Sequence, residues 1–103
     1  MPNETAEVKV TISRNPDRTL KVSPDPFFVH KHQDQYVKWE CTSKEYFTVE
    51  FANGSPFYES QFSTDSPSSG IVKRNVLADT GKIYKYTVRI GETMLDPGGG
   101  VNK

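Results

Sequence analysis

The sequence predicts an all-β fold, a Greek-key sandwich of seven to eight short strands, on three observations. Apolar and polar residues alternate with period two in four segments, and residues 37–41 (VKWEC) are one of them. Turn-forming Asn, Asp, Gly and Pro residues separate these segments at short intervals. No stretch of ten or more residues has apolar side chains at helical spacing. Strands with one buried and one solvated face are typical of antiparallel sheets that pack face to face.

All 103 residues are expected to form a single domain. The expected strands are residues 8–13, 19–22, 27–32, 36–42, 47–51, 71–77, 82–90 and 93–101. The segments 27–32 and 36–42 are expected to pair as a hairpin around residues 33–35 (QDQ). Residues 1–5 and 98–103 are expected to be frayed ends, because three consecutive glycines at 98–100 weaken the last strand.

Composition excludes two classes of partner. Thirteen basic and thirteen acidic side chains cancel, whereas binding to nucleic acid phosphates requires a positive surplus. No apolar run approaches the roughly 20 residues of a membrane helix, so no membrane association is expected. Six Phe, five Tyr and one Trp compensate for a low apolar content of 34% and can fill a thin core.

The first residues and the cysteine count bear on the compartment. Residues 1–5 (MPNET) have neither the basic nor the apolar region of a signal peptide. This favours the cytoplasm, and a secreted chain without its leader is the alternative. The single cysteine, Cys41, excludes an internal disulfide and fits a reducing compartment.

A long loop interrupts the regular spacing of strands. Residues 53–70 are rich in Ser and Pro and contain Phe57, Tyr58 and Phe62. Loops of this length in compact domains usually have a function or a local fold. The three aromatic side chains either close one end of the sandwich core or form an exposed surface that docks another protein.

Two stretches carry a family resemblance. Residues 34–39 (DQYVKW), followed by 46–51 (YFTVEF), resemble the Gly-Asp-x-Val-x-Trp/Phe start of a central strand in the cupredoxin family and the strand after it. Residues 80–88 (TGKIYKYTV) resemble the family's Pro-Gly-x-Tyr-x-Tyr segment. The resemblance spans residues 8–101 and implies a cupredoxin-like sandwich. An immunoglobulin-like sandwich, which has the same alternation, is the alternative.

The resemblance also implies where copper ligands would lie, and this chain departs from the family there. The family takes one His from the middle strand, then Cys, His and Met from a loop after the last long strand. Here Phe47 or Thr48 stands at the first position, and Val88 and Gly91 stand near the next two. Only Met94 remains, whereas a copper electron-transfer site needs two imidazoles and a thiolate. We therefore expect no copper site and no other cofactor.

Two histidines offer an alternative metal site. His30 and His32 are two residues apart, so on a strand both point to one face. In the expected hairpin that face is solvated, whereas Cys41 points to the core, so no third ligand joins them. A metal-handling or electron-transfer protein that uses His30 and His32, with or without Met94, is the alternative function.

No group of residues has the spacing of a catalytic site. The serines of the 53–70 loop have no His or acid nearby in sequence, and a Gly-x-Ser-x-Gly elbow is absent. The leading hypothesis is a non-enzymatic module, a protein-interaction or structural domain whose partner is another protein. Outward charges on the strands at Lys9, Lys38 and Lys85 discourage edge-to-edge pairing and favour a monomer.

Overall fold

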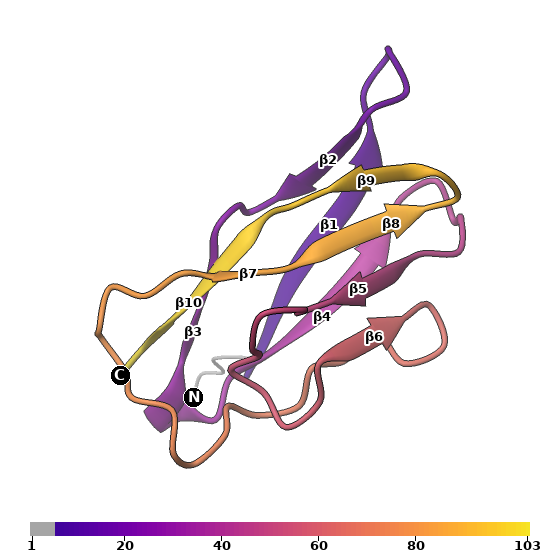
Figure 1. Cartoon of the computed structure of the whole chain (residues 1–103). Coiled ribbons are helices and arrows are strands. Elements are labelled where there is room, and N and C mark those ends of the chain that lie inside the picture. The colour runs from indigo at the N-terminus through magenta and orange to yellow at the C-terminus, as the bar shows by residue number, and fades with distance from the viewer. Residues whose placement is uncertain (1–5) are drawn as a thin grey trace.

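The computed structural model describes residues 6–103 and is all-β (Figure 1). Its strands are β1 (Glu7–Arg14), β2 (Leu20–Ser23), β3 (Phe27–His30), β4 (Tyr36–Cys41), β5 (Thr48–Glu50), β6 (Gln61–Ser63), β7 (Tyr84–Lys85), β8 (Thr87–Ile90), β9 (Thr93–Leu95) and β10 (Gly98–Asn102). A short 3-10 helix, η1 (Lys31–Gln33), links β3 to β4. Within the described residues, no helix is long and apolar enough to span a bilayer. The expected fraying of residues 1–5 lies outside the described part of the chain.

The strands form three sheets in two facing layers. One sheet has the order β2-β1-β4, the second β6-β5-β8-β9 and the third β3-β10-β7. In Figure 1 the first sheet lies behind the second, and the third continues the second because β7 leads into β8 and β9 leads into β10. The pairs β1–β4 and β3–β10 are parallel, and the other strand pairs are antiparallel.

Aromatic rings fill the space between the layers, as the composition predicts. The ring of Trp39 stacks on Phe62 with centroids 5.2 Å apart and meets the edges of Tyr86 and Phe27 at 5.7 and 6.4 Å. Such pairs each add roughly 0.5–1.5 kcal/mol to the stability that burial of their area supplies. Aromatic side chains therefore fill much of this core, and the buried ones are Phe27, Trp39, Phe47, Phe51, Phe57, Phe62 and Tyr86.

Two buried polar atoms, Trp39 Nε1 and the Tyr86 hydroxyl oxygen, have no hydrogen-bond partner among residues 6–103. Burial raises the pKa of Tyr86 far above its ordinary value. The neighbouring indole N–H of Trp39 offsets part of that rise in pKa, although the two groups are not in hydrogen-bond geometry. The phenol therefore stays neutral.

The glycines at 98–100 form the central strand of the third sheet instead of a frayed end. β10 pairs with β3 on one side and with β7 on the other. A Cβ atom added at Gly99 would lie 2.1 to 2.5 Å from three ring atoms of Phe27, so the neighbouring side chain occupies the space that a larger residue would need. Glycine here marks a close approach of side chain and backbone, and not flexibility.

Three expected strands differ in the structure. Residues 71–77 form a loop, in which Val72 and Val76 are buried while Ile71 and Leu77 are exposed, so the buried positions are four residues apart and not two. Stretch 82–90 divides into β7 and β8, and stretch 93–101 divides into β9 and β10 at Pro97, which cannot donate a ladder hydrogen bond. The short strand β6 was not expected. These changes convert the expected eight strands into ten.

The expected hairpin of residues 27–32 and 36–42 does not form. β3 pairs in parallel with β10 in one layer, and β4 pairs in parallel with β1 in the other. The left-handed residue Asp34, with φ 54°, lets the chain cross between the layers after η1. The prediction that these two strands pair because they are close in sequence is therefore wrong.

Candidate functional site

Apolar side chains occupy two of the positions at which the cupredoxin resemblance implies copper ligands. Phe47, just before β5, is buried, and its main-chain N–H donates to Thr64 Oγ1 at 2.9 Å. Val88 on β8 is fully buried opposite Val49. Gly91 lies in the exposed turn between β8 and β9 with φ 60°, and Met94 is exposed on β9. These positions supply one thioether and no imidazole or thiolate.

A surface hollow of about 300 Å³ lies beside Phe47. It is lined by Trp39, Glu40, Cys41, Lys44, Glu45, Phe47, Thr64 and Pro67. Its lining has two carboxylates and one thiol, and within the described part of the chain such side chains do not gather as a metal ion requires.

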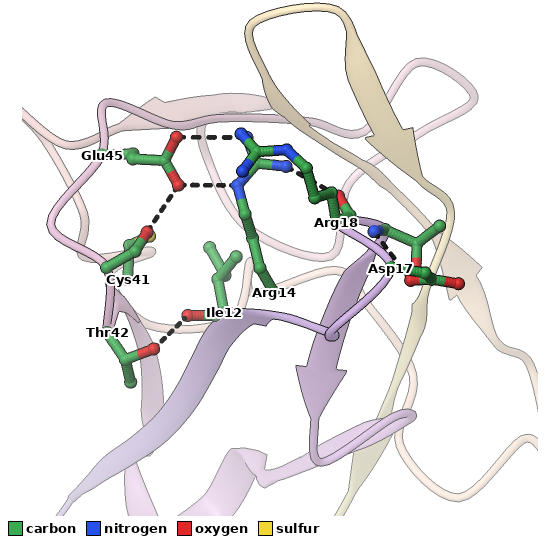
Figure 2. A network of polar contacts seen from close by, with 9 residues as sticks. Ile12, Arg14, Asp17, Arg18, Cys41, Thr42 and Glu45 are labelled. Atoms are coloured by element: carbon green, nitrogen blue, oxygen red, sulfur yellow. Dashed lines mark hydrogen bonds and ion pairs between the residues drawn. The ribbon is translucent and has the colours of Figure 1, made fainter.

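An ion pair holds this end of the molecule together (Figure 2). Arg14 Nε and Nη2 donate to the two carboxylate oxygens of Glu45 at 2.8 and 3.1 Å, which is the strong bidentate geometry. Ser43 Oγ donates to the same carboxylate at 2.6 Å and lies 3.2 Å from Cys41 Sγ. Hydrogen bonds from Arg14 and then Ser43 lower the pKa of Glu45 to about 2. The network links β1 to the loop after β4, so we assign it a structural role.

We expect acid to weaken the bond between Arg14 and Glu45, and Glu45→Gln to remove the part of the acid sensitivity that comes from this bond. The pKa of Glu45 is lower in the folded chain than its ordinary value of 4.5, so its stabilisation is present above pH 4.5 and is lost as the pH falls towards about 2. We expect Glu45→Gln to lower the free energy of unfolding at neutral pH and to flatten its decline in that acidic range. Urea unfolding at several pH values measures both effects.

Glu40→Gln is the matched control. Glu40 pairs with Lys9 at 3.4 Å, and both side chains are more than half exposed, so this pair contributes little. If Glu40→Gln changes the pH dependence of the free energy of unfolding as much as Glu45→Gln does, the bond between Arg14 and Glu45 is not the source of that pH dependence.

The two histidines lie near the opposite end and do not share a site. His30 Nδ1 lies 2.8 Å from the main-chain oxygen of Lys103, so that ring nitrogen carries the proton and donates it. His32 is exposed in η1. Cys41 is at the far end of β4, a strand of six residues that spans roughly 20 Å. Across residues 6–103, no three His, Cys, Asp or Glu side chains gather as a metal ion requires.

The structure separates the three aromatic residues of the 53–70 loop. Phe57 is 0% exposed and Phe62 is 5% exposed, whereas Tyr58 is 61% exposed. Phe57 and Phe62 therefore belong to the core and cannot form the expected docking surface together with Tyr58. The hydroxyl of Tyr58 accepts a hydrogen bond from the main-chain N–H of Arg74 at 3.2 Å. Of the three, only Tyr58 is exposed to solvent.

A groove of about 520 Å³ lies on this same end, next to the loop that Tyr58 contacts. We call it the lysine groove. Its lining residues come from the turn after β5, from the loop before β7 and from the start of β7, and they are Gly54, Ser55, Lys73, Asn75, Val76, Leu77, Thr80, Lys82 and Tyr84. Sequence reasoning missed it, because it placed residues 71–77 in a strand and because no local motif joins residue 54 to residue 82.

The loop that forms one wall of the lysine groove has a defined conformation without regular secondary structure. Lys31 Nζ donates to the main-chain oxygens of Arg74 and Val76. The N–H of Lys73 donates to Pro56 O at 2.8 Å, which fastens the loop to the segment that follows β5. These contacts satisfy backbone groups that a strand ladder would otherwise satisfy.

No protein-family model matches the chain, and no curated protein or solved structure is significantly similar to it.

Proposed function

We propose that the chain is a non-enzymatic protein-interaction domain, built on a cupredoxin-like Greek-key sandwich without a copper site. The observation that carries the proposal is that Phe47 and Val88, which lie at or next to positions where the resemblance implies ligands, are buried apolar side chains. Filling those positions removes the chemistry and leaves a framework that presents loops at both ends.

The strand connections support the cupredoxin-like sandwich over the immunoglobulin-like alternative. β1 lies between β2 and β4, and β5 lies between β6 and β8, so the chain skips between layers as Greek-key connections do. Immunoglobulin-like sandwiches are built from two antiparallel sheets, whereas this chain has the parallel pairs β1–β4 and β3–β10.

The polar contacts support a non-enzymatic role. The carboxylate of Glu45 is engaged by Arg14, the thiol of Cys41 contacts Ser43, and the ring nitrogen of His30 faces a main-chain oxygen. A nucleophile needs a base within hydrogen-bond reach, and the imidazoles lie towards the opposite end from the thiol. In this fold the carboxylate, the thiol and the imidazole are engaged in structural contacts.

Titration with Cu(II) tests the metal-free part of the proposal. We expect no visible thiolate-to-copper absorption band at equimolar metal, and no saturable joint change of the His30 and His32 imidazole signals in NMR spectra. A saturable change of both signals that His30→Ala abolishes would instead support the metal-handling alternative.

Site-specific photo-cross-linking tests the interaction part. A photoreactive residue is placed at Leu77 beside the lysine groove or at Met94 on the opposite end, two side chains that are 73% and 54% exposed. We expect one discrete cross-linked protein from one of the two positions in extracts of the source cells. Absence of a product from both positions contradicts an interaction domain and leaves a structural one.

A further inference from the structure

The lysine groove carries a local charge that the neutral composition hides. Lys73 and Lys82 line it, and no carboxylate does. Among the described residues, neither ammonium group has a carboxylate within ion-pair distance, and Lys82 Nζ lies over the Tyr84 ring at 4.7 Å. The hollow beside Phe47, in contrast, is lined by Glu40 and Glu45 as well as by a lysine. Two lysines in a lining without a carboxylate favour an anionic occupant.

The groove also offers an apolar contact between its charges. Leu77 is 73% exposed, and its neighbour Val76 is buried. Because Val76 anchors the loop in the core and Lys31 binds its main-chain oxygen, Leu77 is held out into solvent at a fixed place. An apolar side chain presented in this way loses little freedom on binding, which favours affinity.

The groove is open to solvent, which favours a chain segment over a small molecule as its occupant. Five of its nine lining residues are exposed, Leu77 and Lys82 among them. Small molecules bind in clefts that bury most of their surface, and this groove does not enclose a ligand. An extended chain segment can lie along it and use both lysines at once.

We infer that the lysine groove binds an extended acidic segment of a partner protein that carries a bulky apolar residue. Lys73 and Lys82 face the carboxylates of that segment, and Leu77 contacts its apolar side chain. The inference rests on the proposed function, because it names the partner chemistry of that same interaction domain. The exposed side-chain amide of Asn75 in the lining can bond the peptide backbone, whereas the buried hydroxyl of Ser55 already donates to Glu59 O.

Fluorescence anisotropy with a labelled synthetic peptide that alternates glutamate and leucine tests the inference on the full chain. We expect saturable binding that weakens as salt shortens the Debye length to a few ångströms, about 3 Å at 1 M. Lys73→Glu combined with Lys82→Glu should weaken binding at least about tenfold, because two attractions become repulsions. Lys73→Gln combined with Lys82→Gln should weaken peptide binding less than the glutamate pair does. Leu77→Ser should weaken peptide binding about tenfold and leave the chain folded.

The matched control is Lys21→Glu combined with Lys44→Glu, which changes the net charge equally at exposed positions outside the groove. The inference is overturned if the glutamate–leucine peptide does not bind, or if the control pair weakens binding as much as the groove pair. It is also overturned if a single-stranded oligonucleotide binds as tightly through the same lysines, because the groove then recognises phosphates.

These failures are distinct from failure of the proposed function. A partner cross-linked from Met94 and not from Leu77, with no peptide binding, refutes the groove and leaves the interaction domain intact. Cross-linking from neither position contradicts the interaction domain itself.

Discussion

Gly99→Ala is expected to lower the free energy of unfolding by about 3 kcal/mol, the upper part of the usual range for overpacking a core. The added Cβ would lie 2.1 Å from Cζ of Phe27, and Phe27 is 0% exposed between Trp39, Phe57 and Tyr86. The ring cannot turn away without displacing those neighbours, because the core is closely packed. Denaturant unfolding of the variant measures the loss.

Gly100→Ala is the control for this prediction. A Cβ at Gly100 would lie 2.6 Å from Cε1 of Phe28, but Phe28 is 45% exposed and its ring can move into solvent. We therefore expect a much smaller cost than at Gly99. Similar losses at the two positions would mean that glycine is needed in β10 for its backbone and not for the space beside Phe27.

Phe57→Ala is expected to cost about 3–5 kcal/mol, the range for removing a buried aromatic ring. The ring of Phe57 lies 6.0 to 6.4 Å, between centroids, from those of Phe27, Phe51 and Phe62. It comes from a segment without regular structure, yet it closes the core between the layers. Thermal and urea unfolding both report the loss.

The adjacent Tyr58→Ala change is the matched control, because Tyr58 is 61% exposed. Its cost should stay within about 0.5 kcal/mol, as for ordinary surface substitutions. If Tyr58→Ala destabilises the fold as much as Phe57→Ala, the hydroxyl bond to Arg74 carries more of the loop than its exposure indicates. If Phe57→Ala is mild, the loop does not close the core.

Local alternation predicted the strands whose two faces differ, and it predicted little about what they pair with. Residues 37–41 alternate so regularly that β4 could be placed from sequence, and Trp39 could be placed in the core. The partner of β4 is β1, some thirty positions earlier and parallel to it, and nothing in either segment indicates this. Pairing depends on the whole layer, so β3 was assigned to the wrong neighbour.

The expected fraying of residues 98–103 was wrong and the lysine groove was not predicted, and both errors have the same origin. Three glycines have no periodicity, so the space taken by Phe27 and Phe28 around β10 could only be found in three dimensions. The positions at which the family resemblance implies copper ligands stay a prediction. The lysine groove could not be predicted, since Lys73, Leu77 and Lys82 are ordinary loop residues until the fold sets them beside residues 54 and 55.

The position of Trp39 makes its intrinsic fluorescence a probe of folding. It is the single tryptophan, it is 1% exposed, and its indole N–H has no hydrogen-bond partner in the described part of the chain. An indole shielded from water emits at shorter wavelengths than a hydrated one, so native emission is blue and opening of the core shifts it to the red. The ring centroid of Tyr86 lies 5.7 Å from that of Trp39, so we expect excitation of this tyrosine to transfer to the indole in the folded chain. Separation of the two layers should therefore raise the tyrosine emission, which reports unfolding at a second wavelength without any added label.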